Sequence, residues 1–169
     1  NSYHTFSFAG YHESSRMNFG VLRVLNDDTV AAGMGFGKHP HDNMEIVSIP
    51  LNGDLEHNDS TGRNEIIKQG DVQIMSAGSG ITHSEKNANH NKEVKFLQIW
   101  VMPAKRNIES RYEQKSFPAE GRMNKLQTVV APNNAEAVWI NQNAWFTLGN
   151  FDNGVASTYS LNKPENGVY

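Results

Sequence analysis

Histidines and carboxylates recur at a two-residue spacing in two short stretches of this sequence. In GKHPHDNMEIVS, residues His39, His41 and Glu45 have the same parity, so in one extended strand their side chains would point to the same face. In GSGITHSEKN, His83 and Glu85 repeat the two-residue spacing. Neutral imidazoles and carboxylates are ligands for Fe(II), Mn, Ni, Cu or Zn. The pattern therefore predicts a site for a divalent metal.

Apolar residues accompany these groups on the same predicted faces. Val47 and Ile49 share the parity of the first set, and Ile81 shares the parity of the second. Burying several imidazoles and carboxylates without a partner is costly, and metal coordination is the usual compensation. A surface or hydrogen-bonded core position explains one such pair, but a histidine pair and a histidine–carboxylate pair on two strands of one domain favour a metal site. Three or four protein ligands would leave positions open for water, substrate or dioxygen.

The residues alone leave two roles open for Glu45. It can be a further ligand, or it can accept a hydrogen bond that orients an imidazole. The remaining histidines carry less signal. His57 is expected to be a hydrogen-bonded sheet residue, and surface positions are expected for His4, His12 and His90.

The composition restricts the class of site. The 169 residues include no cysteine, which excludes a thiolate metal site, a thiol nucleophile and a disulfide framework. A net charge of −3 with dispersed Lys and Arg gives no footprint for direct nucleic-acid binding or for an anionic membrane. No apolar run reaches membrane-spanning length and no signal sequence is present, so a cytoplasmic protein is expected. Because the sequence lacks an initiator Met and stops within an apolar strand pattern, we expect a fragment of a longer protein.

The predicted metal-binding residues must be positioned by β-strands, and the sequence shows strand patterns around them. Short runs of Val, Ile, Leu and Phe alternate with Gly, Asn, Asp and Pro, with a turn signal about every eight to twelve residues. This pattern predicts an all-β barrel or sandwich. The strands are expected at residues 19–25, 29–36, 45–51, 54–59, 64–69, 71–77, 80–87 and 94–103.

The composition changes after Pro103. Residues 104–123 are polar and charged without a strand pattern, and we expect a linker with one helical turn. Strand signals return in LQTVVAP, AEAVWI, AWFTLGNF and VASTYSL, and the sequence ends in NGVY. The predicted organisation is a metal-binding barrel (1–103), a linker (104–123) and the start of a second barrel (124–169).

The metal-binding stretches resemble the two motifs of the cupin signature. The first motif, Gly, His-x-His, Glu and Gly, is similar to GMGFGKHPHDNMEIVSIPLNG, where the last Gly comes one residue late. The second motif, Gly, Pro-x-Gly, His and Asn, is similar to GDVQIMSAGSGITHSEKN, where Ser76 replaces Pro and two extra residues precede the His. Together with SYHTFSF, FGVLRVLNDD, LEHNDS and FLQIWVMP, these departures resemble the pirin family over nearly all of residues 2–115.

The resemblance implies two cupin jelly-roll barrels, of which only the N-terminal one holds a metal. INQNAWFTLGNF is similar to the start of the second barrel, which would be incomplete here. The resemblance implies His39, His41, His83 and Glu85 as the metal ligands and places Glu45 outside the ligand set. It implies Fe(II) as the metal, with Zn, Mn, Ni, Co or Cu able to take its place.

For a bacterial pirin, the resemblance implies quercetin 2,3-dioxygenase activity, in which O2 cleaves the ring of a flavonol or related enolic aromatic. Glu85 or Glu45 is the expected proton acceptor, and Val47, Ile49 and Met75 are expected to line an aromatic-sized pocket. The alternative is a non-enzymatic, iron-binding regulator that acts through a protein partner. A third possibility is a structural cupin whose site stays empty.

Overall fold

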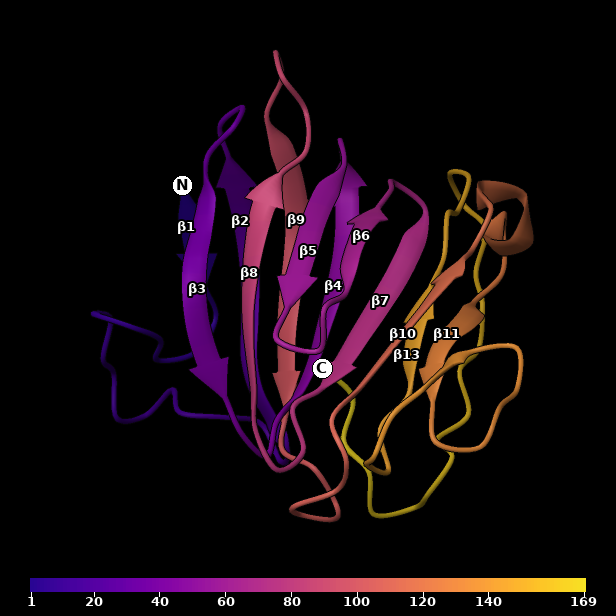
Figure 1. The fold of residues 1–169 in the computed structure, drawn as a ribbon. Coiled ribbons are helices and arrows are strands. Elements are labelled where there is room, and N and C mark those ends of the chain that lie inside the picture. The colour runs from indigo at the N-terminus through magenta and orange to yellow at the C-terminus, as the bar shows by residue number, and fades with distance from the viewer.

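The computed structural model describes residues 1–169, and β-strands dominate it (Figure 1). The elements are β1 (Ser2–His4), β2 (Leu22–Val30), β3 (Gly35–His41), β4 (Glu45–Asn52), β5 (Leu55–Asp59), β6 (Asn64–Ile67), β7 (Asp71–Ser76), β8 (Ile81–Asn87), β9 (Val94–Val101), β10 (Arg111–Ser116), the 3-10 helix η1 (Ala119–Arg122), β11 (Gln127–Ala131), β12 (Val138–Trp139) and β13 (Phe146–Leu148). The prediction of an all-β chain is confirmed. The structure contains no helix that could span a membrane.

Two antiparallel sheets face each other and form a barrel (Figure 1). The first sheet has six strands in the order β1-β2-β9-β4-β7-β10, and the second has four in the order β3-β8-β5-β6. The chain crosses repeatedly from one sheet to the other, as in a jelly roll. These crossings bring β3, which carries His39 and His41, next to β8, which carries His83 and Glu85, in the four-stranded sheet.

Strand β2 is longer than predicted. The strands predicted at 19–25 and 29–36 leave Asn26, Asp27 and Asp28 between them, but β2 continues through these residues to Val30. Asn26 and Asp28 are only 1% and 2% exposed because they face the barrel interior. Residues typical of turns therefore stand in a strand here because the interior is polar. The other strands predicted from residue 45 to residue 103 end within two residues of the observed bounds.

The predicted linker contains a strand of the barrel. β10 pairs with β7 from Arg111, opposite Ser76, to Ser116, opposite Asp71. The expectation that 104–123 lacks a strand is wrong, because an edge strand with polar side chains shows no apolar alternation. The expected helical turn is present as η1.

The C-terminal residues form a third sheet, in the order β12-β11-β13, against the outer face of the six-stranded sheet. One apolar cluster joins the two sheets. Its members are Val47, Ile49, Val72, Ile74, Ile99, Val101, Phe117, Val129, Val130, Val138 and Ile140. No strand forms at VASTYSL, contrary to prediction. The assignment of residues 124–169 to the start of a second barrel stays a prediction.

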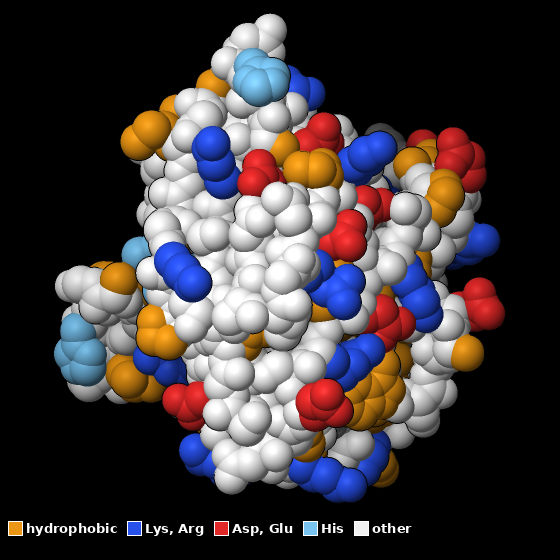
Figure 2. Space-filling model, viewed as in Figure 1, with side chains coloured by type: hydrophobic (Ala, Val, Ile, Leu, Met, Phe, Trp, Pro, Cys, Tyr) orange, Lys and Arg blue, Asp and Glu red, His pale blue; other side chains and the backbone are white.

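A row of polar side chains crosses the inner face of the six-stranded sheet. Asn26 lies opposite Gln98, Gln98 opposite Ser48, and Ser48 opposite Gln73. We call these four residues the polar row, and their side chains lie in the barrel at 0–7% exposure. On the face shown in Figure 2, by contrast, positive and negative side chains are interspersed and form no extended region of one sign.

Candidate metal centre

Three of the predicted ligands lie together where β3 ends and β8 begins. One nitrogen each from His39, His41 and His83 lies within 4.8 Å of the other two. His39 is the register partner of His83, and the ring centroids of these two residues are 4.5 Å apart. The ring of His41 lies 4.8 Å from that of His39 and 4.9 Å from that of His83. Two adjacent strands thus present the three imidazoles to one point.

The free nitrogens of this cluster fit a divalent metal. Both ring nitrogens of His83 and Nε2 of His41 are buried without a hydrogen-bond partner. Nδ1 of His39 lies 2.7 Å from the carbonyl oxygen of Gly37. This contact assigns the proton to Nδ1, which donates it to that oxygen and leaves Nε2 free to bind.

The protonation of the cluster also suits metal binding. Burial, reinforced by the neighbouring imidazole of His39, lowers the pKa of His41 to about 4 and that of His83 to about 3. Both rings are therefore neutral near pH 7, and neutral imidazole is the form that coordinates a metal.

Glu85 lies in the same barrel, but its carboxylate is not among the atoms that cluster within 4.8 Å. The side chain is buried, and both oxygens face the six-stranded sheet. Oε1 accepts a hydrogen bond from Ser48 Oγ at 3.0 Å, and Oε2 accepts one from Gln98 Nε2. Burial raises the pKa of Glu85, against the effect of these two donors. The role of Glu85 as fourth ligand stays a prediction.

Glu45 is separated from the histidines. β3 ends at His41 and β4 begins at Glu45 in the opposite sheet, with Asn43 in the left-handed region (φ 47°) between them. The inference that one strand face presents all three residues is wrong. The Glu45 carboxylate accepts hydrogen bonds from Ser76 Oγ at 2.8 Å and from the backbone N–H of Asn141 at 3.1 Å. Glu45 therefore faces the C-terminal segment rather than the barrel interior.

A pocket of about 390 Å³ opens beside the cluster. Its lining is mostly polar: Pro40, His41, Asp42, Ser60, Gly80, Ile81 and Thr82. Two of the three apolar residues predicted to line the site, Val47 and Ile49, face the C-terminal sheet instead. The third, Met75, packs in a small buried cluster with Ile46, Ala77 and Ile81. Of that cluster, only Ile81 also lines the pocket.

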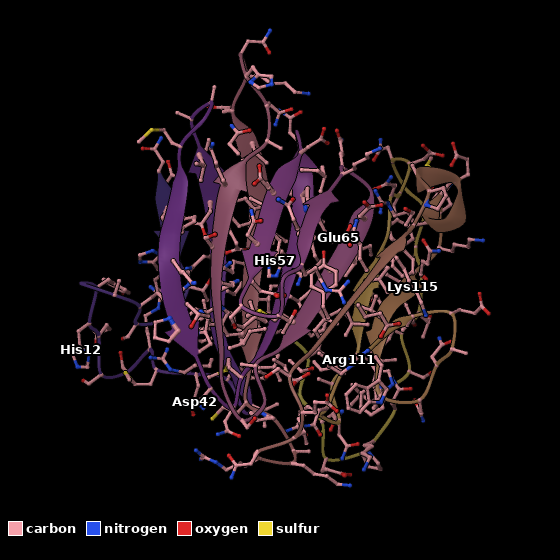
Figure 3. The ribbon with its side chains drawn as sticks, in the orientation of Figure 1. His12, Asp42, His57, Glu65, Arg111 and Lys115 are labelled. Atoms are coloured by element: carbon pink, nitrogen blue, oxygen red, sulfur yellow. The ribbon has the colours of Figure 1, made fainter.

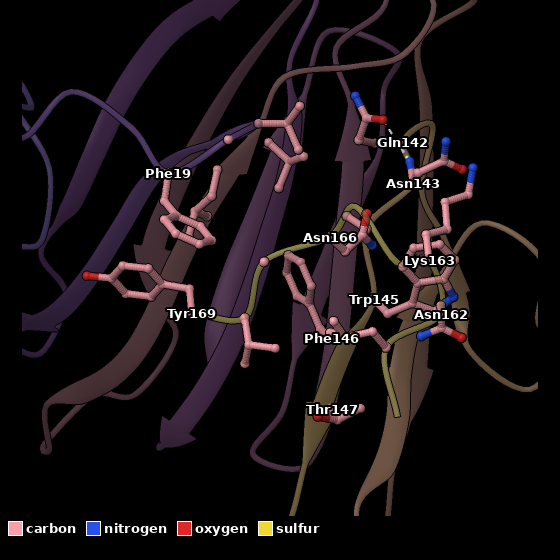
Figure 4. A pocket seen from close by; sticks show the side chains of 18 of the residues that line it. Phe19, Gln142, Asn143, Trp145, Phe146, Thr147, Asn162, Lys163, Asn166 and Tyr169 are labelled. Atoms are coloured by element: carbon pink, nitrogen blue, oxygen red, sulfur yellow. Dashed lines mark hydrogen bonds between the residues drawn. The ribbon is translucent and has the colours of Figure 1, made fainter. Parts of the chain in front are cut away.

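A larger pocket than this one lies elsewhere. It measures about 730 Å³ and lies between the outer face of the six-stranded sheet and the C-terminal segment. Figure 4 shows Phe19 and Tyr169 on one side of it and Gln142, Asn143 and Lys163 on the other. None of the predicted metal ligands lines this pocket, so size alone does not identify the site.

Neighbours of the histidines extend the site. His57 is 1% exposed, its Nε2 lies 3.1 Å from Asp59 Oδ2, and its ring lies 5.4 Å from that of His83. Figure 3 shows His57 in the barrel, so the prediction of a hydrogen-bonded sheet histidine is confirmed. The ring of Trp100 meets that of His41 edge to face at 4.8 Å.

The other histidines lie away from the cluster. His12 is exposed on the N-terminal loop (Figure 3), and His90 is exposed in the β8–β9 connection, both as expected. His4 is half-buried, with Nε2 2.7 Å from Ser2 Oγ.

Several known proteins are similar to this chain in fold and in sequence. A bacterial pirin from Escherichia coli, YhhW, whose structure was solved in complex with nickel(II), superposes with a TM-score of 0.79 at 43% identity, over 84% of this chain and 60% of that one. A quercetin 2,3-dioxygenase of Escherichia coli K12 is 51% identical over 118 residues, which are 70% of this chain and 51% of that protein. A pirin-like protein of Caulobacter vibrioides is 37% identical over 166 residues, which are 97% of this chain and 71% of that protein.

These likenesses confirm the predicted cupin-type β-barrel. The chain spans about half the length of the Escherichia coli quercetin 2,3-dioxygenase that it matches. The family model for pirin matches residues 1–101, which carry the whole barrel up to β9 and all three clustered histidines. The chain belongs to the pirin family.

Proposed function

We propose that this chain supplies the metal-binding barrel of a dioxygenase that cleaves quercetin or a related flavonol or enolic aromatic with O2. The observation that carries the proposal is the cluster of three imidazoles, of which His41 and His83 are neutral with unpaired nitrogens, beside an open pocket. The likeness to a relative named quercetin 2,3-dioxygenase, at 51% identity, supports the reaction class.

His39, His41 and His83 would hold the metal, for which we propose Fe(II), and Glu85 is the proposed fourth ligand. Once bound, the metal would supply Lewis acidity that lowers the pKa of a substrate hydroxyl. Ring nitrogens that already face one another need little rearrangement to serve this role.

The pocket beside His41 would bind the substrate. Its volume of about 390 Å³ falls within the range of small-molecule sites, which is roughly 300–1,000 Å³. Asp42 offers a hydrogen-bond acceptor, and the hydroxyls of Ser60 and Thr82 offer donors and acceptors. Ser60 Oγ accepts the backbone N–H of Thr82 at 3.1 Å, which fixes its position and leaves its own proton free to donate. These groups suit a hydroxylated planar molecule.

Glu85 is the proposed proton acceptor. It lies on β8 two residues from His83, and a carboxylate close to a metal-bound hydroxyl can serve as its general base. The barrel around it excludes bulk water, since Glu85 is only 2% exposed.

Oxygen uptake tests this proposal. Fe(II)-loaded protein should consume O2 when quercetin is added, and His39→Ala and His83→Ala should abolish that uptake. His90→Ala is the matched control, because His90 is exposed and distant from the cluster, and it should leave uptake unchanged. Uptake that persists in the His39 and His83 variants would show that the site is wrong. Metal binding without any uptake would overturn the enzymatic proposal in favour of a regulator that acts through a protein partner.

A further inference from the structure

Glu85 is held by two residues of the polar row. It extends from β8 in the four-stranded sheet and meets Ser48 on β4 and Gln98 on β9 in the opposite sheet. Each donor contacts a different oxygen, so the position and the rotation of the carboxylate are both fixed. All three side chains are at most 7% exposed.

We propose that Ser48 and Gln98 are positioning residues of the metal site, which fix the carboxylate of Glu85 as a ligand. This inference rests on the proposed function, in which Glu85 completes the set of three histidines. Ser48 and Gln98 would contact neither metal nor substrate and would act only through Glu85.

The chemistry of a carboxylate supports such a role. An ionised carboxylate has about four acceptor positions on its two oxygens, and Ser48 and Gln98 occupy two of them. The others stay available on the side chain, whose base on β8 lies two residues from His83. Carboxylates that bind metals are commonly hydrogen-bonded in turn, and loss of such partners typically weakens metal affinity about 10- to 100-fold.

The polar row itself shows that this arrangement is selective. Gln73 and Asn26 belong to the same row and are equally buried, yet neither side-chain amide has a hydrogen-bond partner. Only the two central members of the row, Ser48 and Gln98, meet Glu85. A general need for polar side chains in the barrel does not explain why both oxygens of Glu85 are bound.

A purely structural role makes a different prediction. As a tie between the two sheets, Glu85 and its donors would contribute to the stability of the metal-free barrel and would leave metal affinity unaffected. Measuring both stability and metal binding on the same variants therefore distinguishes the two roles.

The variants are Gln98→Met and, as a matched control, Gln73→Met. Both exchanges keep the length of the side chain, remove one buried amide and lie on the inner face of the same sheet, but only Gln98 contacts Glu85. Ser48→Ala removes the other donor with a minimal change in volume, and it provides an independent test if Gln98→Met does not fold.

Ni2+ affinity is measured by titration calorimetry, the coordination sphere by Co2+ absorption, and the melting temperature in EDTA. Gln98→Met and Ser48→Ala should weaken Ni2+ binding about 10-fold or more. They should also shift the Co2+ spectrum toward that of Glu85→Gln, whereas Gln73→Met should match the parent in both measurements.

Parent-like Ni2+ affinity and Co2+ spectrum in Gln98→Met and Ser48→Ala, with only a lower melting temperature, would overturn the inference and leave Glu85 as a structural tie. Parent-like Ni2+ binding by Glu85→Gln would also overturn it, since Glu85 would not be a ligand, while the histidine site would stand. Parent-like binding by His39→Ala would instead refute the metal site of the proposed function.

Discussion

Acid should destabilise the metal-free protein through His83 and His41. Burial lowers the native pKa of His83 to about 3 and that of His41 to about 4, whereas both residues titrate at the ordinary value of 6.5 in the unfolded chain. Between these values the unfolded state binds more protons than the native state. The free energy of unfolding therefore falls as the pH is lowered from about 6.5 toward about 4.

The size of this change in the free energy of unfolding depends mainly on protonation of the unfolded state. At about pH 5 an unfolded imidazole of pKa 6.5 is almost fully protonated while native His83 is neutral, which favours unfolding by about 2 kcal/mol. His41 should contribute less than this, since it is only half-buried and solvent screens its interactions. Buried Glu85 and Glu45 have raised pKa values and act in the opposite direction, so the total change is smaller than the histidine contribution alone.

Urea denaturation in EDTA at about pH 7.5 and about pH 5 isolates the contribution of His83. The comparison is between the parent and His83→Gln, in which both glutamates are retained. The loss of unfolding free energy between the two pH values should be smaller by about 2 kcal/mol in the variant. An equal loss in both proteins would refute the view that His83 is held neutral in the native barrel.

Three further changes test individual positions. Asn87→Ala should lower the free energy of unfolding by about 3 kcal/mol in urea denaturation. The reason is that the Asn87 side chain donates to Val30 O and Lys92 O and accepts two hydrogen bonds from Asn89. A loss under about 1 kcal/mol would contradict this. Gly78→Ala should cost about 2 kcal/mol or more in the same assay, since Gly78 has φ 54° and a new Cβ would overlap the carbonyl oxygen of Ile108; a neutral effect would show that the turn can relax. Glu45→Gln should leave Ni2+ affinity unchanged and lower the free energy of unfolding by about 1 kcal/mol, because it weakens the hydrogen bond from the backbone N–H of Asn141. Weaker Ni2+ binding by this variant would show that Glu45 contributes to the metal site.

Sequence spacing identified the histidine cluster because the relevant geometry is local. His39 and His41 lie two residues apart within one strand, and His83 stands in a second strand with similar turn signals around it. Spacing alone does not give the pairing of β3 with β8, which brings His83 next to the other two histidines. The same parity rule failed for Glu45, because a loop with a left-handed residue at Asn43 carries the chain to the other sheet.

Other errors have a common cause in the polar interior of the barrel. Asn26 and Asp28 were left outside the predicted strands because those residue types favour turns, although here they face inward from β2. Val47 and Ile49 were assigned to the site because they share the parity of His39 and His41, although they pack against the C-terminal sheet. Gln98 carried a usable signal, since a lone polar residue in the run FLQIWV indicates a buried hydrogen-bond partner.

Metal stoichiometry tests the central claim most directly. The purified chain is incubated with Ni2+, freed of excess metal by gel filtration and analysed by mass spectrometry for metal per chain. We predict one ion per chain for the parent and for His90→Ala, and none for His39→Ala or His83→Ala, because His39 and His83 belong to the only group of three potential ligands found within 4.8 Å of one another. No bound metal in the parent, or a full ion retained by His83→Ala, would contradict the assignment of these histidines as the metal centre.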